Sequence, residues 1–209
     1  MQMDPNNAIT ITYVDDKLDP MISEYLGKID KSSVNDYNII TKEVEFNANF
    51  NYEKLIESDS IKQSDIIIID SRLFENCNTH GNKFTGEEFK LIIKECCPFI
   101  EVIVITQKEI CEGCDTIKKY CVPMYKSKYE SSETYYNNNL YPAIEKSIVA
   151  IKDYRSIAKI LKDNNNIDEL LVEKITNSVD RIYLYNDLKK EDITEIIKLF
   201  NELKSGFNG

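Results

Sequence analysis

Acidic, hydroxyl and basic side chains that could act together in chemistry follow several short apolar runs in this 209-residue chain: Asp15, Asp16, Asp70, Thr106 and Lys126. Three carboxylates close together repel one another, and a divalent cation is the usual relief. A small number of hard oxygen ligands suits Mg²⁺ that keeps some of its waters. With a carboxylate nucleophile, a hydroxyl and an ammonium group, such a metal supplies the positioning and charge neutralisation that phosphoryl transfer requires.

Each of these residues also has an ordinary structural interpretation when taken alone. Asp70 is equally well explained as a helix N-cap or a turn residue. A single Thr106 at the end of a strand more often packs or caps, and a single Lys126 is more often solvated. The chemical interpretation therefore depends on whether the fold brings these side chains to one place.

Residues 66–69 predict the central strand of that fold. These four consecutive isoleucines, bounded by polar residues, are too short for an ordinary helix and lack the alternation of a half-exposed strand. They indicate a strand buried on both faces, which is typical of parallel sheets. Ligands of open parallel sheets bind beyond the carboxyl ends of the strands, which is where Asp70 stands.

Other strands and helices alternate along the chain and predict an α/β fold. Pro20, with Asp19 as a cap, suits the first position of a helix, and Pro123 suits an edge strand. Strands are expected at 8–14, 37–46, 66–69, 101–106 and 122–126, and helices at 20–29, 52–60, 85–94 and 111–120. All five polar groups then fall on one rim of one sheet.

The order of an acidic pair, Asp, Thr and Lys at successive strand ends resembles the receiver domain of two-component response regulators, over about residues 8–161. The resemblance implies a doubly wound five-stranded parallel sheet in the order 2-1-3-4-5, the flavodoxin-like receiver fold. It also implies a phosphoacceptor signalling protein in which a sensor histidine kinase or another phosphodonor phosphorylates Asp70.

The same resemblance implies a role for each candidate residue. The ligands of Mg²⁺ would be Asp15, Asp16, Asp70 and the backbone carbonyl of Arg72. Thr106 would bond the phosphoryl oxygens, and Lys126 would pair with them.

The sequence departs from the family pattern around the lysine. Ser127 follows Lys126 where the family usually has proline, and Pro123 stands where the family has its switch aromatic. Lys128, with Tyr125 three residues before it, is the alternative to Lys126 as the site lysine. In addition, the polar segment 71–85 is longer than usual and could cover Asp70.

Two other functions stay open. The rearranged lysine region favours a receiver-like interaction module that keeps the fold without depending on phosphorylation. An independent metal-dependent enzyme lacks a visible substrate-pocket signature. In the phosphoacceptor interpretation, enzymatic activity amounts at most to self-phosphorylation and dephosphorylation of Asp70.

Helical segments are expected to dominate the chain after residue 140. One apolar face runs through 141–161, a second helix includes Leu170 and Val179, and Asp192 caps a third. These patterns predict a receiver-like domain at 1–161 and a helical C-terminal extension at 162–209. Because its charges nearly balance, we expect the extension to contact protein, either a second copy or another component.

Bulk composition argues against nucleic acid and membrane as partners. The formal net charge of −10 disfavours binding to a phosphate backbone. No apolar run approaches the roughly 20 residues that a membrane span requires, and the first residues lack a signal-peptide pattern. The protein is therefore expected to be cytoplasmic.

The six cysteines are expected to be free thiols, although Cys111 and Cys114 have the spacing of half a zinc site. His80 is the only histidine, which excludes His-based triads and multi-histidine metal sites. We predict that protein purified without added zinc contains far less than one equivalent of zinc by elemental analysis. About one equivalent, lost when Cys111 or Cys114 is replaced by serine, would contradict this prediction.

Overall fold

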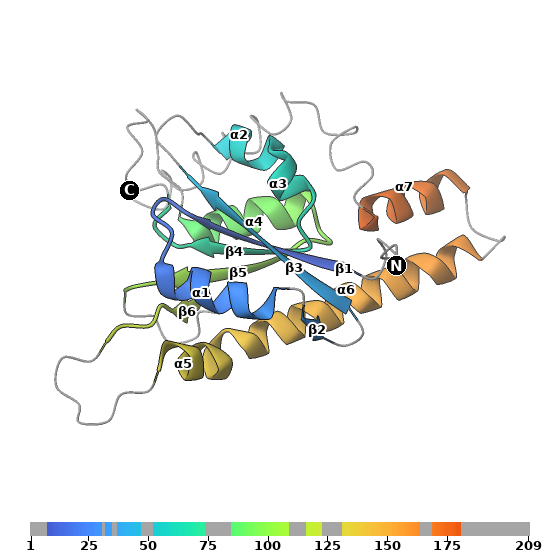
Figure 1. The fold of residues 1–209 in the computed structure, drawn as a ribbon. Helices are drawn as coiled ribbons and strands as arrows, with labels where there is room; N and C mark the ends of the chain where they lie inside the picture. Colours follow the sequence, from blue (N-terminus) through green and yellow to red (C-terminus); the bar gives the residue numbers. More distant parts are fainter. Residues whose placement is uncertain are drawn as a thin grey trace.

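A six-stranded sheet organises the fold (Figure 1). The computed structural model describes residues 8–30, 32–34, 37–46, 52–73, 85–108, 116–122, 131–163 and 169–180. The strands are β1 (Ala8–Asp15), β2 (Ser33–Val34), β3 (Tyr37–Glu45), β4 (Ile66–Asp70), β5 (Glu101–Thr106) and β6 (Thr116–Lys118), in the spatial order β2-β3-β1-β4-β5-β6. All pairs are parallel except β2 with β3. The five parallel strands confirm the predicted α/β fold and the order 2-1-3-4-5.

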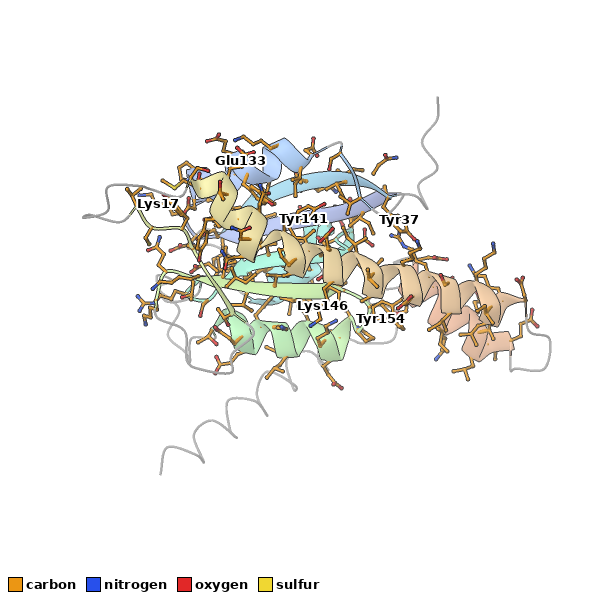
Figure 2. The ribbon with its side chains drawn as sticks, turned by 90° about the horizontal axis from the view of Figure 1, so that it is seen from below. Lys17, Tyr37, Glu133, Tyr141, Lys146 and Tyr154 are labelled. Carbon is orange, nitrogen blue, oxygen red and sulfur yellow. The ribbon has the colours of Figure 1, made fainter. Side chains whose placement is uncertain are left out.

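Helices cover both faces of the sheet. The helices α1 (Pro20–Ile29), α5 (Ser132–Asn139) and α6 (Tyr141–Lys162) lie on one face, and α2 (Tyr52–Glu57), α3 (Asp59–Lys62) and α4 (Gly86–Cys96) lie on the other (Figure 1). Figure 2 shows Tyr141, Lys146 and Tyr154 along α6, and Glu133 of α5 beside α1, where it pairs with Lys28 at 2.7 Å. The sheet is thus the middle of three layers.

The isoleucines of β4 contribute to both cores. Ile67 and Ile69 pack under α2, α3 and α4, whereas Ile66 and Ile68 pack under α1 and α6, and all four are fully buried. Successive side chains of a strand point to opposite faces, so an unbroken apolar run fills both layers. This confirms the prediction of a doubly buried central strand.

Local capping fixes where the first and fourth helices begin. The Asp19 side chain accepts a hydrogen bond from the Met21 backbone N–H, and Pro20 occupies the first helical turn. Thr85 and Glu88 form a capping box at the start of α4. Both helices therefore begin beside the carboxyl ends of β1 and β4.

The fifth parallel strand lies earlier in the chain than predicted. The expected helix over residues 111–120 is wrong where β6 lies, because Ile117 pairs with Ile105 and Lys118 with Thr106. Of the expected strand at 122–126, Val122 is exposed outside any strand, and the remainder lies outside the described residues. Ile110, Cys114, Ile117 and Cys121 are spaced as on a helix face, which explains the misassignment.

The C-terminal part of the described chain is helical. The predicted first helix is confirmed by α6, and α7 (Glu169–Val179) follows it. Ser178 and Val179 line a small cavity at the amino end of β4 and β5, together with Phe99 and Tyr154. The predicted helix from Asp192 lies outside the described residues. No helix in the described ranges has the length and hydropathy needed to cross a bilayer.

An ion pair between half-buried Arg155 and buried Asp65 fastens α6 to the amino end of the sheet. Arg155 Nη2 lies 2.8 Å from Asp65 Oδ1, and Arg155 Nη1 donates to the Ala8 carbonyl at 3.1 Å. The other oxygen of Asp65 accepts from the Thr10 backbone N–H at 2.8 Å. The Arg155 guanidinium also stacks over the Tyr37 ring, 5.3 Å from its centroid. One arginine thus joins α6 to β1, β3 and the residue before β4.

We predict that Arg155→Met lowers the free energy of unfolding by about 2 kcal/mol, because it leaves the buried Asp65 carboxylate without its cation while keeping the aliphatic stem. Urea unfolding followed by circular dichroism measures this. Lys159→Met, on the exposed side of the same helix, is the matched control and should change stability by less than about 0.5 kcal/mol. Equal free energies of unfolding for the two variants would contradict a stabilising role of the Arg155–Asp65 ion pair.

Candidate functional site

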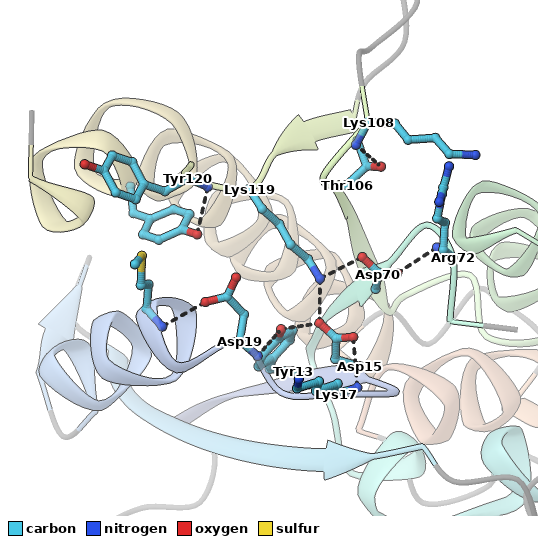
Figure 3. Close-up of polar contacts among 12 residues, drawn as sticks. Tyr13, Asp15, Lys17, Asp19, Asp70, Arg72, Thr106, Lys108, Lys119 and Tyr120 are labelled. Carbon is cyan, nitrogen blue, oxygen red and sulfur yellow. Dashed lines mark hydrogen bonds and ion pairs between the residues drawn. The ribbon is translucent and has the colours of Figure 1, made fainter. Parts of the chain in front are cut away.

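Two buried carboxylates meet at the carboxyl ends of neighbouring strands (Figure 3). Asp15 is the last residue of β1, and Asp70 is the last residue of β4. Because β1 and β4 are parallel neighbours, these ends lie on the same rim of the sheet. Asp15 is 1% exposed and Asp70 is 6% exposed, so neither carboxylate is solvated like a surface acid.

Lys119 lies between the two carboxylates. Its Nζ atom is 2.6 Å from Asp15 Oδ2 and 2.8 Å from Asp70 Oδ1, and the residue is only 5% exposed (Figure 3). Lys119 directly follows β6, and its backbone N–H donates to the Thr106 carbonyl at 2.6 Å. The short edge strand therefore positions the Lys119 ammonium beside the carboxylates at the ends of β1 and β4.

The site lysine in the structure differs from the one that sequence reasoning selected. Lys126 and its alternative Lys128 lie outside the described residues, whereas Lys119 contacts both acids. The missed signal is the short alternation Thr116–Lys118 directly before Lys119. With one apolar residue in three, this strand is too short for periodicity to reveal.

Asp15 is held by donors besides Lys119. The Tyr13 hydroxyl donates to Asp15 Oδ2, and the Lys17 backbone N–H donates to Oδ1 at 3.3 Å. The same Tyr13 oxygen accepts from the Asp19 backbone N–H at 3.1 Å. Burial and the neighbouring Asp15 raise the pKa of Tyr13, so its hydroxyl stays a proton donor. Sequence reasoning missed Tyr13 because a strand tyrosine reads as core.

Asp70 is a buried acid with a basic neighbour and an acidic one. Its Oδ2 atom accepts from the Arg72 backbone N–H at 2.8 Å. Burial raises the pKa of Asp70, with a further increase from Asp15, although Lys119 acts in the opposite sense. Burial alone would lower the pKa of Lys119, but hydrogen bonds to both carboxylates raise it. One charged ammonium therefore serves two acids.

The other predicted site residues lie near this cluster. Asp16 is half-buried directly after β1, and Thr106 is buried at the end of β5. The Thr106 hydroxyl accepts from the Lys108 backbone N–H at 3.2 Å. Arg72 reaches Asp70 through its backbone N–H, while the predicted role belonged to its carbonyl. Asp15 and Asp70 are thus joined through Lys119, and Thr106 stands at the adjoining strand end.

The predicted magnesium site fits this cluster in its donor chemistry. Among the described residues, no group of three acidic, histidine or cysteine side chains is arranged to hold a metal ion. The Lys119 ammonium balances part of the negative charge of Asp15 and Asp70. Mg²⁺ is commonly held by one or two carboxylates and several waters, and Asp16 and Asp70 offer oxygen donors of that kind at strand ends of the same rim. A metal at this rim stays a prediction.

Comparisons with known proteins do not assign this chain to a family. No family model, no curated protein and no solved structure matches it. The proposed function therefore rests on the geometry of Asp15, Asp70 and Lys119 and on the fold that positions them.

The start of α4 packs directly against the backbone of Asp70. The Gly86 backbone N–H donates to the Ser71 carbonyl at 2.8 Å. A Cβ atom on Gly86 would lie 2.7 Å from the Asp70 carbonyl oxygen and 2.9 Å from Ser71 Cα. Both obstacles are backbone atoms, so only glycine fits without moving the end of β4.

We predict that Gly86→Ala destabilises the protein by about 1–3 kcal/mol, because the added methyl group displaces the backbone that carries Asp70. Gly27→Ala is the matched control, since Gly27 is an exposed residue of α1 with nothing within 4 Å of the added atom. That change should stabilise by about 0.5–1 kcal/mol. Thermal unfolding of both variants measures the two effects. A Gly86→Ala variant as stable as the unmodified chain, or more stable, would show that the backbone of Asp70 and Ser71 can accommodate a side chain at this position.

Proposed function

We propose that this protein is a phosphoacceptor signalling protein of the flavodoxin-like receiver type, phosphorylated on Asp70. The observation that carries the proposal is Asp70 itself, a buried carboxylate at the end of the central strand. It lies between the Lys119 ammonium and the Arg72 backbone N–H. Open α/β sheets bind ligands beyond this rim, where the strand order changes direction.

The chemistry is a transfer to a carboxylate. One oxygen of Asp70 attacks the phosphorus of a phosphodonor, an acyl phosphate forms, and the donor's leaving group departs with the bonding electrons. Burial makes this carboxylate more basic than a surface acid. Lys119, in the role first expected of Lys126, balances the added negative charge, and the Thr106 hydroxyl at the next strand end bonds a phosphoryl oxygen.

Bound Mg²⁺ would supply charge neutralisation between the phosphoryl group and the rim. Asp16 and Asp70 would ligate it with the Arg72 carbonyl, and Asp15 would complete the acidic rim while bonded to Tyr13 and Lys119. Asp15 Oδ2 already accepts from two donors. Asp16, half-buried directly after β1, would be the member of the acidic pair that ligates the metal.

The proposed partners are a sensor histidine kinase or another phosphodonor, and a protein that receives the signal. Exposed apolar side chains on α6 and α7 support an output by protein contact, with a second copy or another component: Ile157, Ile160, Leu170 and Leu171. Among the described residues, Cys96, Cys97 and Cys121 are free thiols. Thiols suit a reducing compartment, so the proposal includes a cytoplasmic location.

A second candidate is an interaction module with this fold that does not depend on phosphorylation. The observation that favours it is the ion cluster, in which the Lys119 ammonium bonds both carboxylates. Tyr120 follows Lys119, so the proline usual after the family's lysine is absent. In this alternative, the buried charges hold β1, β4 and β6 in register and serve the fold alone.

Labelling with a small acyl phosphate, followed by intact-protein mass spectrometry, separates the two functions. We predict one added phosphoryl group per chain, dependent on Mg²⁺ and absent from Asp70→Asn. Lys119→Met should slow labelling at least about tenfold, because a buried charge-assisted hydrogen bond is lost. Lys126→Met and Lys118→Met are the matched controls and should label at nearly the rate of the unmodified chain.

Failure of the unmodified chain to label with any of several phosphodonors would favour the interaction module. Labelling that survives in Asp70→Asn would place the acceptor elsewhere. Loss of labelling in Lys126→Met, with Lys119→Met unaffected, would return the site lysine to the position that the sequence first suggested.

A further inference from the structure

The hydrogen bonds of the sheet hold β6, the strand directly before Lys119, only weakly. β6 contains three residues and, within the described part of the chain, pairs with β5 alone, at Val104, Ile105 and Thr106. Strands this short give little independent stability. Lys119 nevertheless reaches two buried carboxylates within 2.8 Å through a flexible side chain. Its backbone therefore needs support beyond the ladder.

Two tyrosine hydroxyls of α5 bond the backbone on either side of Lys119. The Tyr135 hydroxyl donates to the Lys118 carbonyl at 2.9 Å. The Tyr136 hydroxyl accepts from the Tyr120 backbone N–H at 3.1 Å. Figure 3 shows this second bond beside Tyr120, on the side of Lys119 away from Asp70. The peptide groups before and after Lys119 are thus both fixed from one helix.

The two tyrosines are themselves fixed by packing. Tyr136 is fully buried, and its ring lies 5.4 Å from the Tyr25 ring of α1. The Tyr135 ring meets Tyr136 edge-on at 5.5 Å and the Tyr120 ring at 5.6 Å. Such aromatic contacts prefer defined geometries, so they hold the hydroxyl groups in place. The Ser131 side chain caps α5 about one helical turn before this pair.

From this geometry we infer that Tyr135 and Tyr136 are positioning residues for Lys119, and that their hydroxyl groups set how well the ammonium engages Asp70. The inference deepens the proposed function, because it assigns α5 a part in the reaction of Asp70 with a phosphodonor. Neither tyrosine touches the reacting atoms. Both act through the backbone of residues 118–120.

The test uses Tyr135→Phe and Tyr136→Phe, which remove only the hydroxyl groups. Tyr25→Phe is the matched control, because its hydroxyl belongs to the same aromatic group but donates to Asn137 rather than to the backbone beside Lys119. The rate of Asp70 labelling should fall about fivefold in each test variant, the factor that corresponds to one hydrogen bond of ordinary strength. The control should label at nearly the original rate.

A second measurement reads Lys119 without any phosphorylation. Amidination of lysines by an imidoester, followed by peptide mass spectrometry, gives the reaction rate of Lys119 against the half-buried Lys118 as an internal reference. In the unmodified chain the buried, ion-paired Lys119 should react slowly. In Tyr135→Phe and Tyr136→Phe, but not in Tyr25→Phe, its rate relative to Lys118 should rise several-fold.

The labelling and the amidination measurements test different statements, so a negative result in one can be told apart from a negative result in the other. If the unmodified chain is not labelled at Asp70, the proposed function falls, and amidination alone decides whether the tyrosines position Lys119. Relative Lys119 reactivity in both test variants equal to that in Tyr25→Phe would overturn the inference. Should Tyr136→Phe fail to fold, Tyr135→Phe decides, because Tyr135 is only half-buried and its loss leaves the inner ring contacts intact.

Discussion

The sharing of one ammonium by two buried carboxylates is the interaction on which the carboxyl rim depends. Asp15 and Asp70 end β1 and β4, and Lys119 directly follows β6, so their ion pairs join the ends of these three strands. Removing charges from water is costly, and a lone buried charge is costlier than a paired one. The strand ends are therefore held together by the buried ion pairs of Lys119 with Asp15 and Asp70.

This arrangement also explains the supporting contacts around the rim. Asp15 needs Tyr13 and the Lys17 backbone because one ammonium cannot satisfy four carboxylate oxygens. Asp70 needs the Arg72 N–H for the same reason. The close approach of Gly86 to the Asp70 backbone brings α4 to this strand end. These contacts keep two acids buried beside a single ammonium at the carboxyl ends of the parallel strands.

Short-range sequence signals predicted most of the strands and helices of the fold, but they did not identify every residue around the buried carboxylates. The isoleucines of β4 and the cap Asp19 each act within a few residues, and both were readable from the sequence. Lys119 was missed because β6 is too short for a period and Ile110, Ile117 and Cys121 imitate a helix face. Tyr135 and Tyr136 were missed because their partners are backbone groups 16 or 17 residues away, which no side-chain pattern encodes.

The near-continuity of α5 and α6 has a mechanical consequence. Only Leu140 separates them, and α6 is anchored to the sheet at Arg155. At 1.5 Å per residue, that anchor lies about 20 Å from the start of α6 and about 10 Å from its end. A rigid helix pivoting there is a lever whose short arm moves opposite to its long arm, at about half the amplitude. Displacement of the tyrosine pair beside Lys119 would then swing the end of α6 next to α7, at the amino end of the sheet.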